Sequence, residues 1–148
     1  MPPVSISIVC KNNKGTLGRV LDAVAPIVAG EGPAAGEVVA VDSGSQDGTI
    51  ELLERHKARV ISSPWLGYIK TKQLALDSCS RPWVLCLDSD EPPEPDLVRS
   101  IVRAVELNDP HISGYRVNRK LYFAGRFLDH CWQPERRLRL VRRGFAKW

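Results

Sequence analysis

The segment that decides the fold is EVVAVDSGSQDGT, which runs from Glu37 to Thr49. Residues 37–41 form a short, mainly apolar run, as expected for a strand that is buried on both faces. The polar residues Asp42–Gly48 that follow are typical of a turn, and a helix is predicted from Thr49 to about Lys57. This order of strand, turn and helix is the repeating unit of a parallel sheet.

The same alternation extends along the chain in both directions. Three further strands are predicted, at 4–10, 59–61 and 83–87. Three further helices are predicted, at 16–28 with Thr16 as its cap, at 68–78, and from Pro92 to about Asn108. Pro26 predicts that the first of these helices kinks or ends there.

The pattern changes after residue 110, where strand-like segments follow one another without helices between them. They lie at 114–119, 121–123 and 138–141. The predicted fold class is therefore α/β, with a mostly parallel sheet flanked by helices and a β-rich C-terminal edge.

The composition fits a single globular domain covering residues 1–148. With 43% hydrophobic and 26% charged residues, the chain is too apolar to be disordered. No apolar run approaches the roughly 20 residues of a membrane-spanning helix, and the first residues lack the basic region of a signal peptide. No cysteine pair has C-x-x-C or zinc-like spacing, so we expect a cytoplasmic protein with four reduced thiols at Cys10, Cys79, Cys86 and Cys131.

Charge is distributed unevenly along the chain. Residues 1–110 hold 11 Lys/Arg and 15 Asp/Glu, a net charge of −4, whereas residues 111–148 hold 10 and 2, a net charge of +8. Six of the C-terminal cations lie close together, at Arg136, Arg137, Arg139, Arg142, Arg143 and Lys147. A strand here would put Arg137 and Arg139 on one face and Leu138 and Leu140 on the other.

Two interpretations of this basic segment stay open. It is either a solvated edge strand that discourages aggregation or a surface, 136–147, that meets an acidic glycolipid or an anionic membrane. Nucleic acid is not expected as a partner, because no aromatic side chains alternate with the basic ones and no nucleic-acid-binding module is recognisable.

Polar segments follow three of the predicted strands. They are Lys11-Asn12-Asn13, Asp42-Ser-Gly-Ser and Asp88-Ser-Asp90. Ligands of open parallel sheets gather outside the carboxyl ends of the strands, so these segments predict a nucleotide pocket. Neither G-x-x-x-x-G-K-[ST] nor G-x-G-x-x-G is present, so the phosphates must be held in another way.

Asp88 and Asp90 offer that way, since two carboxylates at a strand end can share Mg²⁺ or Mn²⁺ with a nucleotide's phosphates. The alternative is an ordinary acidic turn in solvent. Asp42 has a similar ambiguity: it either caps its own turn or accepts hydrogen bonds from a base or ribose. The spacing alone does not decide between these alternatives.

These residues also carry a resemblance to a known family. Val39–Thr49, VAVDSGSQDGT, resembles the V-V-D-S-G-S-x-D-x-T signature of family 2 glycosyltransferases, the inverting GT-A group. WLG at Trp65–Gly67, followed by Lys72-Gln73 and Ala75-Leu76, is similar to that family's W-x-G…K-N-x-A-L. WVLCLDSDE, Trp83–Glu91, resembles its W-[IV]-L-x-[LI]-D-A-D-E. Three C-terminal segments, 114–117, 123–126 and 137–140, resemble the branch that contains the lipopolysaccharide-core glucosyltransferases.

The resemblance implies a GT-A, Rossmann-like fold and a role for each matching residue. Asn12 would lie in the loop on the uracil side, and Asp42 would bind uracil or ribose. Lys72 would approach the donor's nucleotide or phosphates. Asp88 would contact the ribose or the metal, and Asp90 would hold the divalent metal, Mg²⁺ or Mn²⁺, that bridges the diphosphate.

An inverting transfer also needs a base that takes the proton of the acceptor hydroxyl. Glu135 in Trp132-Gln-Pro-Glu135 occupies the position where relatives often carry Asp, and it is our candidate. The alternative is a surface glutamate paired with Arg136 or Arg139, and His130 is a weaker candidate. Asn13, Gln73, Cys131 and Glu135 depart from the residues more common in the family.

The sequence thus predicts a glycosyltransferase that moves a sugar, with inversion, from a nucleotide-sugar donor to a saccharide or glycolipid acceptor. The donor is expected to be a UDP-sugar, and the product a lipopolysaccharide or other cell-envelope glycan. Residues 1–110 would bind the nucleotide-sugar, and 111–148 would begin an acceptor-side part that is expected to be truncated. The alternative is a nucleotide-sugar-binding domain without turnover. The expected location is the cytoplasm, at the inner face of the membrane if 136–147 contact it.

Overall fold

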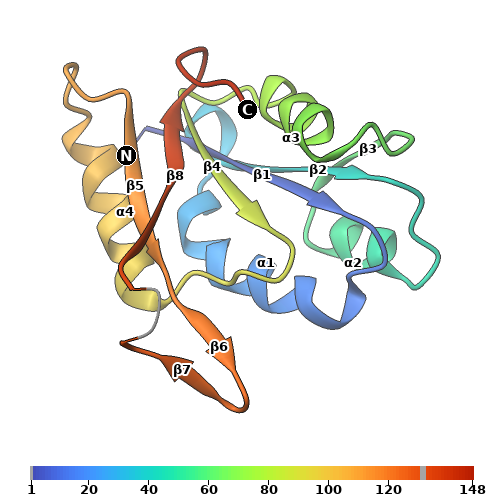
Figure 1. Cartoon of the computed structure of the whole chain (residues 1–148). Coiled ribbons are helices and arrows are strands. Elements are labelled where there is room, and N and C mark those ends of the chain that lie inside the picture. The colour runs from blue at the N-terminus through green and yellow to red at the C-terminus, as the bar shows by residue number, and fades with distance from the viewer. Residues whose placement is uncertain (1, 131–132) are drawn as a thin grey trace.

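The computed structural model describes residues 2–130 and 133–148 (Figure 1). Its strands are β1 (Val4–Cys10), β2 (Glu37–Asp42), β3 (Arg59–Ser62), β4 (Trp83–Asp88), β5 (Gly114–Arg119), β6 (Leu121–Phe123), β7 (Arg126–Leu128) and β8 (Glu135–Arg142). Its helices are α1 (Lys14–Val28), α2 (Thr49–Arg55), α3 (Tyr68–Asp77) and α4 (Pro95–Leu107), with a single 3₁₀ turn, η1, at Gly32–Ala34.

Six strands form one sheet in the order β3-β2-β1-β4-β8-β5. β1, β2, β3 and β4 run parallel, while β8 runs antiparallel to both of its neighbours, β4 and β5. β6 and β7 form a separate hairpin that extends from one end of the molecule in Figure 1. The architecture confirms the predicted α/β fold, with its parallel sheet, flanking helices and β-rich C-terminal part.

Side chains alternate between the two faces of the sheet and form two cores. Ile6, Ile8 and Leu85 pack on the side of α1, α2 and α4, in the larger core. Val39 and Val84 face the other side, where α3 and the segment after β8 cover them. Because β2 and β4 are buried on both faces, they are nearly continuous apolar runs, whereas β1 also carries two buried serines, Ser5 and Ser7.

Helix boundaries differ in detail from the expectations. α1 begins at Lys14, with Asn13 in the cap position, and Thr16 lies inside the helix. The helix also continues through Pro26 to Val28, because residues on both sides of the proline, Val24 and Ile27, are buried in the core. α4 begins only at Pro95, since a proline fits best in the first turn of a helix.

The basic C-terminal strand is not a solvated edge strand, which corrects that expectation. β8 lies inside the sheet, between β4 and β5, and β5 forms the edge. Arg139, Leu140 and Val141 are buried in it. β8 is also longer than the predicted 138–141, and the hairpin strand β7 was not expected. Among the described residues, no helix is long and apolar enough to cross a bilayer.

Candidate functional site

The candidate site lies where the strand order of the sheet reverses, between β1 and β4. Strand order runs from β1 outward to β2 and β3 on one side and to β4 on the other, so the connections after β1 and β4 leave in opposite directions. A crevice at the carboxyl ends of two such strands is the usual ligand site of an open α/β sheet. Asp42 is level with Cys10 and Asp88 is level with Val9, which brings both aspartates to this edge.

Asp42 is bound by its own loop. The carboxylate is 1% exposed and accepts hydrogen bonds from the backbone N–H groups of Gly44 (3.0 Å) and Ser45 (2.9 Å) and from the Ser45 hydroxyl. The Cys10 thiol lies 3.6 Å from its Oδ1. These contacts are those of a residue that caps its turn, so the role of Asp42 toward uracil or ribose stays a prediction.

Asn12 joins the loop after β1 to the loop after β2. Its Oδ1 accepts a hydrogen bond from the Gln46 N–H (2.8 Å), and its own N–H donates to Ser45 Oγ (2.8 Å). Asn12 has a positive φ of 55°, which asparagine tolerates better than most residues. The two loops predicted to face the nucleotide therefore form one hydrogen-bonded unit, although Asn12 itself is exposed.

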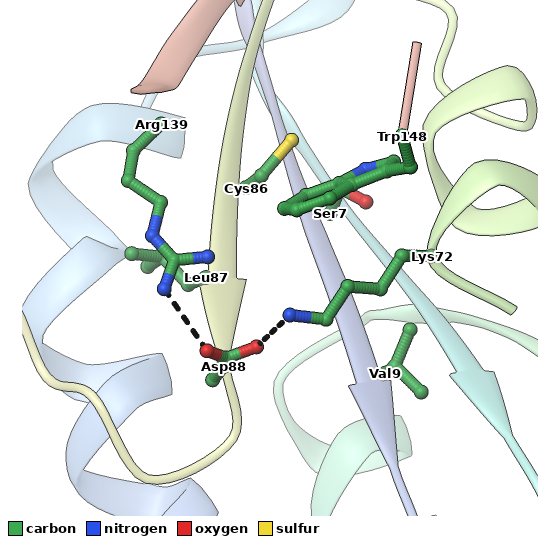
Figure 2. A pocket seen from close by; sticks show the side chains of 8 residues that line it. All are labelled: Ser7, Val9, Lys72, Cys86, Leu87, Asp88, Arg139 and Trp148. Atoms are coloured by element: carbon green, nitrogen blue, oxygen red, sulfur yellow. Dashed lines mark hydrogen bonds and ion pairs between the residues drawn. The ribbon is translucent and has the colours of Figure 1, made fainter. Parts of the chain in front are cut away.

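Asp88 is held between two cations from different parts of the chain (Figure 2). Lys72 Nζ on α3 lies 2.6 Å from its Oδ1, and Arg139 Nη2 on β8 lies 3.0 Å from its Oδ2. Burial alone would raise the pKa of Asp88, but the hydrogen bond from Lys72 and the charge of Arg139 outweigh it and lower the pKa below its usual value. The carboxylate is therefore ionised at neutral pH.

A small cavity adjoins this cluster. Ser7, Val9, Cys86 and Leu87 of the central strands line it together with the Lys72, Asp88 and Arg139 side chains and Trp148. In Figure 2 the Trp148 indole lies along one wall. The Lys72 ammonium is 4.7 Å from the centre of the indole ring, and the backbone N–H of Trp148 donates to Gln73 Oε1 (2.9 Å). Lys72 thus has an anion on one side and an aromatic face on the other.

Asp90 differs from Asp88 in being exposed. Within 2–130 and 133–148, its carboxylate has no hydrogen bond or ion pair, and no three His, Cys, Asp or Glu side chains gather as a metal site. Mg²⁺ and Mn²⁺ at nucleotide sites take one or two carboxylates and fill the remaining positions with phosphate oxygens and water. Asp90 is therefore suited to bind a metal ion that arrives with a diphosphate. Asp88 is less suited to bind it, because both of its oxygens already accept hydrogen bonds, from Lys72 and Arg139.

Glu135 begins β8 and lies among arginines. Arg119 binds it with two nitrogens, Nε to Oε2 (3.0 Å) and Nη2 to Oε1 (2.8 Å), and Arg137 Nη2 lies 2.7 Å from Oε1. Hydrogen bonds from Arg137 and Arg119 lower the pKa of Glu135. The partners differ from the expected Arg136 or Arg139. His130 is exposed and lines a separate hollow beside β7, and Cys131 lies outside the described residues.

Arg139 is the residue that the sequence analysis did not assign to the site. Only 7% of its side chain is exposed, and its Nη2 binds both Asp88 and Glu91 (2.8 Å). Burial raises the pKa of Glu91 even though Arg139 and Arg119 both bind it. The available signal was the apolar pair Leu140-Val141 directly after Arg139, because two adjacent apolar residues are typical of a strand that is buried on both faces. The cysteines Cys10, Cys79 and Cys86 are free and buried, in agreement with the expectation for them.

Comparisons with known proteins agree with this geometry. Residues 5–143 match the family model described as glycosyl transferase family 2. The chain is 33% identical over 156 residues to the lipopolysaccharide core biosynthesis glycosyltransferase LpsC of Rhizobium meliloti, covering 99% of this chain and 53% of LpsC. An uncharacterized glycosyltransferase of Rickettsia felis is 37% identical over 91 residues, which are 62% of this chain and 30% of that protein. The chain thus spans about half the length of LpsC and less of the other.

Solved structures share the fold. Glucosyl-3-phosphoglycerate synthase from Mycobacterium tuberculosis, in complex with Mn²⁺, uridine diphosphate and phosphoglyceric acid, aligns with a TM-score of 0.62 and 27% identity over 78% of this chain and 42% of that one. Mannosyl-3-phosphoglycerate synthase from Rubrobacter xylanophilus aligns with a TM-score of 0.60 and 24% identity, over 77% and 39% of the two chains, which shows the fold alone.

Proposed function

Because the chain belongs to glycosyl transferase family 2, we propose that it transfers a sugar, with inversion, from a UDP-sugar donor to a saccharide or lipid-linked acceptor. The observation that carries this proposal is the cluster at the end of β4, where Asp88 is paired with Lys72 and Arg139 next to the exposed Asp90. The mycobacterial neighbour, solved with Mn²⁺ and uridine diphosphate, supports the same type of donor.

The donor would lie across the carboxyl ends of β1, β2 and β4. The loop unit of Asn12 and Asp42 would face uracil and ribose. Lys72 would face the diphosphate, because 22% of its side chain is exposed, compared with 7% of the Arg139 side chain. Asp90 would hold Mg²⁺ or Mn²⁺, with Asp88 beside it. The metal, when bound, neutralises the charge that grows on the leaving diphosphate.

Glu135 would accept the proton. The acceptor hydroxyl attacks the anomeric carbon from the side opposite the leaving UDP, so the configuration inverts, and the hydroxyl proton passes to a Glu135 oxygen. The hydrogen bonds from Arg137 and Arg119 lower its pKa, which keeps the carboxylate ionised at neutral pH but makes it a weaker base; displacement of Arg137 by the acceptor would raise the pKa. Arg119 and Arg137 fix its orientation, and they must leave one lone pair accessible to the acceptor.

The acceptor is proposed from the relative LpsC, whose name places it in lipopolysaccharide core biosynthesis. We propose an acidic glycolipid as this acceptor. Of the six cations in 136–147, Arg137, Arg139 and Arg142 are occupied by contacts within the protein. Arg136, Arg143 and Lys147 are exposed, and we propose these three for contact with the acceptor or with anionic lipid.

Calorimetric titration with UDP in the presence of Mn²⁺ tests the donor site. We expect Asp90→Ala to weaken UDP binding at least about tenfold when Mn²⁺ is present and to leave the metal-free affinity unchanged. Asp22→Ala, which also removes an exposed carboxylate, is the matched control and should bind as the wild type does. Equal affinity of Asp90→Ala and the wild type in Mn²⁺ would overturn the metal site.

Release of UDP from a panel of UDP-sugars tests turnover. With a lipopolysaccharide-core acceptor present, we expect release from one or a few of the donors, and the anomeric configuration of the product should be inverted. UDP binding without release from any donor would support the alternative function, a nucleotide-sugar-binding domain, and would contradict the transfer reaction.

A further inference from the structure

We propose that Arg139 is a positioning residue for the donor site: it holds both ends of the turn that presents Asp90 to the metal. The inference rests on the proposed function, since it concerns how the metal carboxylate is oriented. Arg139 itself does not face the diphosphate, because its guanidinium is buried against the two carboxylates it binds.

Residues 88–91 form a turn whose two ends are held together by the backbone and by Arg139, and we call the contacts of Arg139 with Asp88 and Glu91 the clamp. The Glu91 N–H donates to the Asp88 carbonyl oxygen (3.2 Å), which closes the turn through the backbone. A single nitrogen of Arg139, Nη2, then bridges the side chains at both ends, 3.0 Å from Asp88 Oδ2 and 2.8 Å from Glu91 Oε2. Asp90 lies between these two fixed points and is the exposed carboxylate of the three.

The position of Arg139 is itself well determined. Its strand, β8, pairs with β4 from Trp83 to Leu85, and the neighbouring Leu140 is buried in the main core. A buried guanidinium is stable only when anions surround it, and Asp88 and Glu91 meet that need. A planar guanidinium can bridge two carboxylates in a set geometry, whereas a lysine ammonium is a single flexible point charge.

The clamp is continuous with the proposed base. Glu91 also binds Arg119 through Oε1 (3.2 Å), and Arg119 binds Glu135 through two nitrogens. A chain of ion pairs therefore connects the end of β4 with the start of β8. A change at Arg139 should for this reason affect the metal carboxylate first and reach Glu135 only through Glu91 and Arg119.

The test compares Arg139→Lys with Arg142→Lys in the full chain. Arg142 is the matched control: it is on the same strand, stacks on buried Trp83 at 4.4 Å, and donates to the carbonyl oxygens of Ile112 and Asp109 but to no carboxylate in the part of the chain that the structure describes. We expect Arg139→Lys to weaken Mn²⁺-dependent UDP binding at least about tenfold, as loss of a residue that orients a metal ligand does. Arg142→Lys should lower the thermal midpoint without changing that affinity.

A second readout needs no ligand. In the metal-free protein, amide hydrogen exchange at Glu91 should speed up in Arg139→Lys and stay unchanged in Arg142→Lys, because only the first variant loosens the 88–91 turn. If Arg139→Lys does not fold, Glu91→Gln removes one half of the clamp with little change in shape and should give the same two results, each smaller.

The outcomes separate the inference from the proposed function. If the wild type binds UDP with Mn²⁺ and Arg139→Lys binds it equally well, with the Glu91 amide equally protected, the positioning role is wrong and the donor site stands. Equal weakening by Arg142→Lys would also contradict it, since the effect would then be one of general stability. If the wild type itself fails to bind UDP with Mn²⁺, both are overturned.

Discussion

Asp42 and Asp88 each end a strand that pairs with β1, and each is followed by a serine, yet their carboxylates are held in different ways. Asp42 is almost completely buried and is bound by neutral donors from its own loop. Asp88 keeps 30% of its side chain exposed and is bound by Lys72 and Arg139, which come from distant elements. The Asp42 end is therefore closed by local hydrogen bonds, and the Asp88 end by a charge network that joins separate parts of the chain.

The difference shows how similar sequence patterns serve two purposes. A carboxylate that satisfies backbone N–H groups stabilises its loop and has little freedom for a ligand. A carboxylate paired with the partly exposed Lys72 can exchange that partner when an anionic or metal-bound ligand arrives, while the buried Arg139 stays in place. The Asp42 end is expected to be a rigid wall of the site, and the Asp88 end to be the part that responds to the donor.

The largest effect expected from this comparison is on stability. Asp42→Ala should lower the free energy of unfolding by about 3 kcal/mol, because it removes three hydrogen bonds that Gly44 and Ser45 donate to the buried carboxylate. Asp88→Ala should cost only about 1 kcal/mol, since Arg139 keeps Glu91 and Lys72 can reach solvent. Urea denaturation of both variants measures the difference, and an equal loss would mean that the two ends are not held differently.

The next effect concerns the far end of the charge network. Glu135→Gln should lower the transfer rate by about 100-fold or more, because the general base is lost. UDP affinity in Mn²⁺ should be unchanged, since two arginines and one glutamate, Arg119, Arg139 and Glu91, separate Glu135 from Asp88 in the ion-pair network. Steady-state rates and calorimetry on the same preparation separate the two quantities. A variant that keeps the wild-type rate would exclude Glu135 as the base.

The smallest expected effect is on the pH dependence of stability. It is measured through two buried thiols, Cys10 near Asp42 and Cys86 near Asp88. Burial raises the pKa of Cys10 to about 12, helped by the charge of Asp42, and burial raises that of Cys86 to about 11, against the opposing charges of Arg139 and Lys72. A thiol whose pKa is raised in the folded state stabilises the fold fully below its unfolded pKa, about 8.5, and that contribution is lost as the pH rises.

The free energy of unfolding should therefore fall between pH 8.5 and 10, by up to about 1.4 kcal/mol per pH unit for each buried thiol. Cys10→Ala and Cys86→Ala should each reduce this slope in a series of urea denaturations. A slope that neither substitution changes would show that the thiols already ionise in the folded protein, and that the two strand ends are open to solvent.

The parallel half of the molecule could be predicted from the sequence because its signals are local. The apolar runs of β1, β2 and β4 and the polar residues after them predicted the carboxyl-end crevice, and the structure places Asp42, Asp88 and Lys72 there. The course of α1 past Pro26 could not be predicted, because it depends on core contacts made by residues on either side of the proline.

For the antiparallel part, the sequence predicted that the segments are strands but not their order in the sheet. Segments 114–119 and 121–123 were identified as strands, but the insertion of β8 between β4 and β5 depends on pairing between residues more than fifty positions apart. The burial of Arg139 follows from that pairing. The meeting of Glu135 with Arg119 follows from the pairing of β5 with β8, in which these two residues lie opposite each other. Counting basic residues therefore suggested a uniformly charged surface, whereas the structure leaves only part of the segment exposed and buries Arg139 in an ion-pair network.

The most direct test of the account is to locate the metal in solution. Dilute Mn²⁺ added to the ¹⁵N-labelled protein with UDP should broaden the amide signals of Asp90 and Glu91 most strongly, with those of Asn12 and Gly44 also affected. Ala34 in η1, which precedes β2 and so lies toward the amino ends of the strands, should be affected least. Strongest broadening at Asp129 or His130 beside β7, or no dependence on UDP, would contradict a metal-nucleotide site at the end of β4.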